Sequence, residues 1–192
     1  MKKLLFAVLL CIAGLAQAAT VEIAGVRFED RIKLGSSELQ LNGVGLRTRF
    51  FISVYAIGLY LPNKSAEVAD VLAMPGPKRL HIAILRDVVA GQFADAVSEG
   101  IRKNHSDAEL EAIKTRIEEL KTTITQARMG HKGTVVDIEW LPESGGTRLT
   151  MDGKQMGKDI AGEDFYRAIL KIWLGAKPIQ DHVKEALLGK RQ

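Results

Sequence analysis

The segment that most constrains the fold of this chain is residues 41–62, LNGVGLRTRFFISVYAIGLYLP. Its second half is rich in β-branched and aromatic side chains, which favour a buried β-strand. The closely spaced Gly43 and Gly45 fit strand bending or close backbone approach, because a phosphate loop would need a third glycine and a following helix. Arg47 then places a cation beside an apolar strand that carries Tyr55. This combination predicts a site for an anionic and largely hydrophobic partner.

The spacing of Arg47 and Tyr55 sets a condition on that site. On one uninterrupted strand, eight residues at about 3.3 Å each would separate them by about 26 Å. They can contact one small ligand only if the chain turns between them, and no glycine or proline marks such a turn. A guanidinium binds a carboxylate through two parallel hydrogen bonds, and a phenol adds a further donor. A structural ion pair of Arg47 and core packing of Tyr55 are the alternatives.

The N-terminus has the features of a secretory signal. Two lysines precede an apolar core over residues 4–15, which is too short to cross a bilayer, and residues 16–18 supply a small-residue cleavage site. A membrane anchor is the alternative interpretation. We expect residues 1–18 to be removed and a single domain over residues 19–192 to reach the periplasm.

Removal of this segment changes what can hold the fold together. It takes away Cys11, the only cysteine, so a packed core rather than a disulfide must stabilise the protein. It also lowers the formal net charge of +4 by two, because it contains two lysines. No basic run indicates nucleic acid binding, and no other apolar stretch is long enough to span a membrane. The remaining length suits one domain.

The period of the apolar residues changes along the chain. Alternating and continuous apolar runs dominate the first half, and helical spacing dominates the region after residue 90. This order favours an α+β fold in which helices pack on one face of an antiparallel sheet. Strands are expected as short pieces within residues 20–46 and over residues 50–61, 78–85, 133–141 and 147–151. Helices are expected over residues 66–74, 90–104, 107–125, 162–175 and 179–188.

Three local patterns give sharper predictions. Ser106 and Glu109 form a capping-box pattern at the start of the helix over residues 107–125, whose charged face is expected in solvent. Gly175 is expected to cap the end of its helix. Asp137 and Glu139 alternate with apolar residues, so they are expected on the solvent face of a strand.

The pattern G-x-G-x-R followed by V-Y-A-I-G-L-Y-L resembles the signature strands of the chalcone isomerase superfamily. That superfamily includes plant chalcone isomerases, plant plastid fatty-acid-binding proteins and bacterial chalcone isomerase-like proteins. The resemblance extends from about residue 39 to residue 188 and implies an open-faced β-sandwich with a ligand cleft between sheet and helices. It also implies a turn near residues 48–50 that pairs the strands of Arg47 and Tyr55. In the fatty-acid-binding members, the matching arginine and tyrosine hold the lipid carboxylate.

The same resemblance raises a catalytic alternative. Plant chalcone isomerases steady a phenolate with an arginine and polarise a ketone with a tyrosine and a threonine. Phe93 stands where their helix motif has a tyrosine, and Gly100 stands where it has an asparagine. Their late threonine falls near Ile172, beside Trp173. These departures keep the cation but make the cleft more apolar, which suits a fatty acyl chain better than a polyphenol. The resemblance thus gives four predicted ligand-binding residues, Arg47, Tyr55, Phe93 and Trp173.

The sequence therefore predicts a secreted, non-catalytic binder of fatty acids or similar small amphiphilic anions. No cofactor or metal is expected, because the four histidines are scattered and no nucleophile motif is present. One alternative is an isomerase or lyase that uses Arg47 on a small unsaturated carbonyl compound. Another is a periplasmic interaction module that docks a partner on the charged helix over residues 107–125. An apolar tunnel that ends at Arg47 would favour the binder, and a polar cleft floor would favour the enzyme. A filled cavity together with an exposed apolar patch would favour the interaction module.

Overall fold

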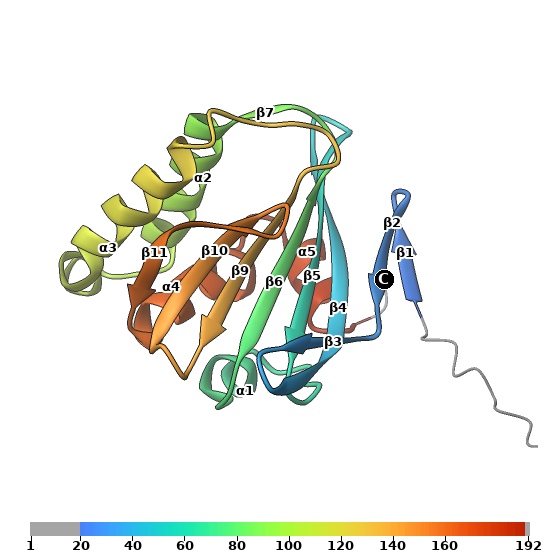
Figure 1. The fold of residues 1–192 in the computed structure, drawn as a ribbon, viewed down its shortest axis with the longest axis horizontal. Helices are drawn as coiled ribbons and strands as arrows, with labels where there is room; N and C mark the ends of the chain where they lie inside the picture. The colour runs from blue at the N-terminus through green and yellow to red at the C-terminus, as the bar shows by residue number, and fades with distance from the viewer. Residues whose placement is uncertain (1–19, 191–192) are drawn as a thin grey trace, which may run out of the picture.

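A computed structural model of the chain describes residues 20–190, so the predicted signal segment lies outside the described residues. Its centre is a curled, seven-stranded antiparallel sheet (Figure 1). In spatial order, the strands are β11 (Lys154–Ala161), β10 (Gly146–Met151), β9 (Val135–Leu141), β6 (Lys78–Ile84), β5 (Ile52–Leu61), β4 (Ser37–Arg49) and β3 (Arg31–Leu34). Two small pairs are added to it, β1 (Thr20–Ile23) with β2 (Val26–Glu29) and β7 (Val88–Val89) with β8 (Met129–Gly130).

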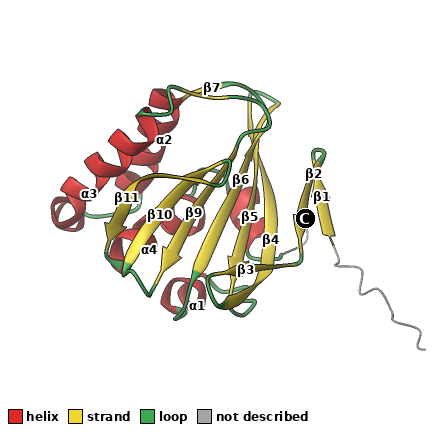
Figure 2. Ribbon diagram, viewed as in Figure 1, coloured by secondary structure: helices red, strands yellow, loops and turns green. Residues whose placement is uncertain are grey.

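The helices gather on one face of this sheet, as Figure 2 shows in red against yellow. They are α1 (Val68–Ala73), α2 (Ala90–Lys103), α3 (Asp107–Thr125), α4 (Glu163–Leu174) and α5 (Asp181–Leu187). Every second residue of the central strands points into the core between sheet and helices, for example Ile57, Leu59 and Leu61 of β5. The predicted α+β class, with helices on one face of an antiparallel sheet, is confirmed.

The opposite face is partly covered as well. Phe28 of β2 reaches across it, and its ring meets that of His81 edge-on at 5.6 Å. A second, smaller apolar cluster forms here around Phe28, Leu41 and Tyr60. The β1–β2 hairpin therefore closes part of a face that an open sheet would leave to water.

The expected exposure is wrong for Glu139, whereas Asp137 is half-buried. Glu139 is buried and lies 2.5 Å from Arg79, its cross-strand partner on β6. Arg148 of β10 is opposite Glu139 on the other side, so Glu139 has an arginine as its cross-strand neighbour on both adjacent strands. Asp137 lies 2.7 Å from the ring of His81. The alternation of polar and apolar residues correctly predicted that both acids lie on the face opposite the helices. Side chains of neighbouring strands cover much of that face, so it is not fully in contact with solvent.

Most expected elements agree with the observed ones within a few residues. Helix α3 has the predicted bounds, and its capping box is formed: Ser106 N–H donates to Glu109 Oε2 at 2.8 Å, and Ser106 Oγ accepts from Glu109 N–H. Strand β4 is one long strand rather than a short piece. Strand β11 was missed because its sequence, KQMGKDIA, has no clear alternation, and only its pairing with β10 identifies it.

Two glycines fit tight places in the fold. A Cβ atom on Gly43 would lie 2.0 Å from the carbonyl oxygen of Ala186 in α5, so the expected close backbone approach is confirmed. Gly175 caps α4 as predicted, and its N–H donates to Lys171 O, but its backbone is extended rather than left-handed. A Cβ atom on Gly175 would meet Asn104 Oδ1 at 2.2 Å, so lack of space is what excludes larger residues there.

Candidate functional site

The hairpin between β4 and β5 brings Arg47 and Tyr55 together. Arg49 pairs with Ile52, and Phe50 and Phe51 form the two-residue loop with φ angles of 48° and 63°. Two consecutive positive φ angles are typical of a type I′ turn. The turn lies slightly later than residues 48–50, and strand β5 begins two residues later than expected. Arg47 and Tyr55 are direct cross-strand partners, so the condition set by their spacing is met.

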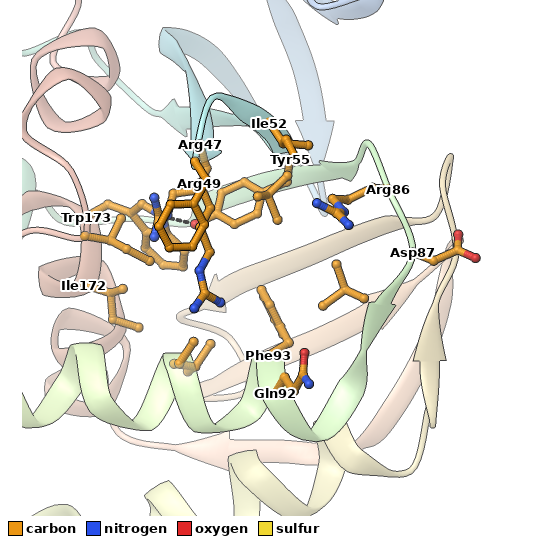
Figure 3. A pocket seen from close by; sticks show the side chains of 16 residues that line it. Arg47, Arg49, Ile52, Tyr55, Arg86, Asp87, Gln92, Phe93, Ile172 and Trp173 are labelled. Atoms are coloured by element: carbon orange, nitrogen blue, oxygen red, sulfur yellow. Dashed lines mark hydrogen bonds between the residues drawn. The ribbon is translucent and has the colours of Figure 1, made fainter.

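A cleft of about 380 Å³ opens beside this hairpin, between the sheet, α2 and α4 (Figure 3). This volume lies in the range of sites for small molecules. The cleft is lined by the four residues predicted from the sequence, Arg47, Tyr55, Phe93 and Trp173. It is also lined by residues that were not predicted as ligands, among them Arg49, Phe50, Ile52, Val54, Arg86, Gln92, Val97 and Ile172. The structure therefore brings the four candidates to one cleft, and their role in ligand binding stays a prediction.

Tyr55 lies at the base of the cleft in a defined orientation. Trp173 Nε1 donates a hydrogen bond to the Tyr55 hydroxyl oxygen at 3.0 Å (dashed line in Figure 3). Burial raises the pKa of Tyr55 to about 12, although the Trp173 hydrogen bond and the charge of Arg47 oppose this shift. Among the described residues, no acceptor is hydrogen-bonded to the Tyr55 hydroxyl proton. The phenol therefore stays neutral and can donate to a ligand.

Arg47 has no carboxylate partner within the described part of the chain. Its Nη1 donates to the carbonyl oxygen of Thr48, and no Asp or Glu oxygen of residues 20–190 lies within 4.0 Å of the guanidinium. The structural ion pair considered as an alternative is therefore not formed. The one acid that lines the cleft, Asp87, accepts hydrogen bonds from Lys132 N–H at 2.9 Å and from the ring of His131. The hydrogen bond from Lys132 is the main reason why the pKa of Asp87 is lowered.

Phe93 separates the cleft from a smaller interior cavity. Its ring meets the ring of Tyr55 edge-on, with 6.5 Å between the centroids. Behind it lies a cavity of about 30 Å³, and Phe93 and Val88 line both spaces. The residues around the inner cavity are apolar or glycine, including Ile124, Leu149 and Met156. The Phe93 ring is thus a shared wall between the cleft that holds Arg47 and Tyr55 and a small apolar cavity beside α2.

A sequence profile of the chalcone isomerase-like family matches residues 19–189. The chain belongs to this family. No match was found among curated proteins. Among solved structures, a fatty-acid binding protein of Arabidopsis thaliana aligns with a TM-score of 0.68 at 18% identity, over 88% of this chain and 96% of that chain. At this identity the likeness shows a shared fold, and the resemblance inferred from residues 41–62 is confirmed.

In this chalcone isomerase-like protein, some features of the cleft had only weak signals in the sequence. Arg86 lies two residues after the end of strand β6, and a charge just beyond a strand is a common loop feature. Gly100 allows α2 to approach α4, because a Cβ atom there would lie 2.8 Å from Ile172 Cγ2. The described residues contain no His, Cys, Asp and Glu cluster suited to a metal ion. None of their helices is both long and apolar enough to cross a bilayer.

Proposed function

We propose that this protein binds fatty acids or similar amphiphilic carboxylates in the cleft without changing them chemically. The observation that carries this proposal is the Arg47 guanidinium, which has no carboxylate partner among residues 20–190, beside the neutral hydroxyl of Tyr55 in a largely apolar cleft. A cation without an internal carboxylate is available to an anion from outside. The fold shared with a fatty-acid binding protein supports the same assignment.

The residues suggest how such a ligand would lie. The carboxylate would accept two parallel hydrogen bonds from Arg47 and one from Tyr55, whose orientation Trp173 fixes. The acyl chain would run along Phe93 and Ile172, which line the cleft. Longer chains would reach the inner cavity if the Phe93 ring rotated, because Phe93 lines both spaces.

The residues of the cleft give little support to the catalytic alternative. General acid–base catalysis needs a group whose pKa lies near the working pH. Tyr55 has a pKa of about 12, the Asp87 carboxylate is held by the loop of Lys132, and no histidine is among the described residues that line the cleft. The interaction-module alternative also lacks an apolar patch on α3, whose apolar side chains Ile113, Ile117 and Leu120 are buried.

Calorimetric titration with a fatty acid and with the fatty alcohol of equal chain length tests the proposal. Arg47→Ala should weaken acid binding by about 2–5 kcal/mol, roughly thirtyfold or more, because the ligand anion loses its charged partner. Arg47→Lys should recover part of this loss, since an ammonium cannot make the planar two-bond contact. Arg27→Ala, on an exposed arginine of β2, is the matched control and should bind like the parent. Equal acid affinity of Arg47→Ala and the parent would overturn the assignment.

We also propose that the binder acts in the periplasm, on the basis of the charged start and short apolar core of residues 1–18. N-terminal sequencing of the exported protein should give Ala19 as the first residue. A protein recovered with Lys2 and Lys3 still attached would contradict this part of the proposal and leave the cleft assignment in place.

A further inference from the structure

We propose that the tip of the β4–β5 hairpin docks on anionic lipid bilayers and sets the mouth of the cleft at the membrane surface. The tip exposes three consecutive large apolar side chains: Phe50 at 81%, Phe51 at 106% and Ile52 at 51% relative exposure. Val89, beside the cleft residue Val88, is a fourth at 45%. Only one other large hydrophobic residue among residues 20–190 is comparably exposed, Val21 in the separate β1–β2 hairpin.

The conformation of the turn does not explain why phenylalanines occupy positions 50 and 51. A type I′ turn needs positive φ at both central positions, which asparagine and glycine adopt most readily. Phe50 and Phe51 hold φ angles of 48° and 63°, a region in which bulky side chains are rare. The tip thus combines an unfavourable backbone conformation with apolar surface in water. Such a combination at a loop tip indicates a role outside the folding of the hairpin.

The charges around the tip identify the partner. Arg49 and Arg86 are exposed, and neither has a carboxylate within 4.0 Å among the described residues. Arg128, also exposed, lies at the same edge, because its carbonyl oxygen accepts from Ala90 N–H at the start of α2. The cleft mouth therefore carries more arginines than acids. Aromatic side chains flanked by cations are typical of segments that enter the interface of an anionic membrane.

The shape of the tip favours a bilayer over a protein partner. The apolar residues project from a two-residue turn, so a protein would need a pocket shaped to receive them. A bilayer interface accepts phenylalanine side chains without such a pocket. Phe50 and Ile52 also line the cleft, so docking would place the cleft mouth at headgroup level. An amphiphilic carboxylate could then pass between bilayer and cleft with little exposure of its chain to water.

Flotation with vesicles tests the docking without any added fatty acid, so its outcome is independent of the proposed ligand. The full chain should bind vesicles of phosphatidylglycerol and phosphatidylethanolamine at least tenfold more tightly than vesicles of phosphatidylcholine, and added salt should weaken the binding. All variants carry the same N-terminus, so any lipid affinity of residues 4–15 is common to them. Equal binding to both vesicle types would overturn the proposal.

One double variant separates docking from folding. Phe50→Asn with Phe51→Gly supplies the residues that a type I′ turn prefers, so Tm should stay equal or rise while vesicle binding falls at least tenfold. Arg49→Glu with Arg86→Glu should weaken binding to anionic vesicles by about fivefold or more per arginine. The controls Val21→Ser and Arg27→Glu, on the β1–β2 hairpin, should bind like the parent. Undiminished binding by the Asn-Gly variant would contradict docking through this tip.

Fluorescence can locate the tip in the bilayer. Phe51→Trp places an indole at the tip, while the native Trp140 and Trp173 are buried and shielded from lipid. Brominated lipids should quench this variant by at least a third and leave Val21→Trp unchanged. An unquenched Trp at position 51 would overturn insertion. A dimer in sedimentation that the Asn-Gly variant abolishes, without vesicle binding by the parent, would identify the tip as a protein interface instead.

Discussion

Arginines on the two faces of the central sheet differ in whether they have a carboxylate partner. On the face away from the helices, Arg79 and Arg148 flank Glu139 in register. Arg148 also donates two hydrogen bonds to Asp159, at 2.9 and 2.7 Å. On the helix face, Arg47 has no carboxylate partner among the described residues. An arginine whose charge is already paired within the protein is not free to bind a ligand, whereas a cation left open at a cleft is available to bind.

Burial does not distinguish the two faces. Tyr55 on the helix face and Tyr60 on the other face are both almost inaccessible to water. The Tyr60 hydroxyl donates to the carbonyl oxygen of Glu29 at 3.0 Å, whereas the Tyr55 hydroxyl accepts from Trp173. The two hydroxyls therefore differ in that the Tyr60 proton is already used inside the protein, whereas the Tyr55 proton has no acceptor among the described residues. Three predictions test this contrast.

The largest effect is expected on the paired face. Glu139→Gln should lower the free energy of unfolding by about 3 kcal/mol, because it leaves Arg79 partly buried without its counter-charge. Glu38→Gln, which removes the exposed partner of Arg31, is the control and should cost less than about 1 kcal/mol. Arg47→Ala should change stability by less than about 0.5 kcal/mol. Urea unfolding of the three variants measures these values.

A large loss of stability on replacing Arg47 would contradict the contrast between the two faces. If Arg47→Ala lost as much stability as Glu139→Gln, Arg47 would be a structural residue like Arg79. The cleft would then lack its proposed anchor.

The second prediction concerns alkaline pH and applies to both faces. The chain has three tyrosines, Tyr55, Tyr60 and Tyr166, and burial raises the pKa of each. A pKa raised by folding means that stability is constant below the unfolded value, about 10, and falls as pH rises toward the folded value. For Tyr55, with a folded pKa of about 12, the loss approaches about 2.7 kcal/mol only at pH values above 12.

The raised pKa values of the tyrosines can be checked by recording tyrosinate absorbance together with circular dichroism as the pH is raised. At pH 10.5 the native protein should show little tyrosinate, and the signal should appear together with unfolding. In concentrated guanidinium chloride, the same phenols should titrate near pH 10. If tyrosine side chains ionised near pH 10 while the circular dichroism stayed native, the phenols would be accessible to water in the folded protein. That result would contradict the prediction.

The smallest effect is expected for the Tyr55 hydroxyl. Tyr55→Phe should weaken fatty acid binding by about 0.5–1.5 kcal/mol, because it removes one neutral donor and leaves Arg47 in place. It also leaves Trp173 Nε1 without its acceptor, so a modest loss of stability is expected as well. Titration with the matching fatty alcohol is the control for the polar contact. A loss larger than that of Arg47→Ala would make the phenol, rather than the guanidinium, the main anchor.

Four of the residues that line the candidate cleft could be predicted from the sequence and the family resemblance. These residues are Arg47, Tyr55, Phe93 and Trp173. The family resemblance also predicted the turn that brings Arg47 and Tyr55 together. The exposure of Glu139 was predicted wrongly, because alternation reports which face a residue is on and not what covers that face. Strand β11 was missed because an edge strand needs to bury little of its own sequence.

The sequence by itself determined most of the elements, the class of the fold and the pairing of a cation with an apolar strand. These follow from local preferences and from the periods of the apolar residues, which act over a few neighbouring positions. Only the tertiary structure decided which charges are neutralised. Arg79 meets Glu139, which lies sixty positions later, whereas Arg47 meets no acid of residues 20–190. Phe50 and Phe51 remain in solvent beside the cleft. Register and packing between distant segments set these outcomes, and no short stretch of sequence contains that information.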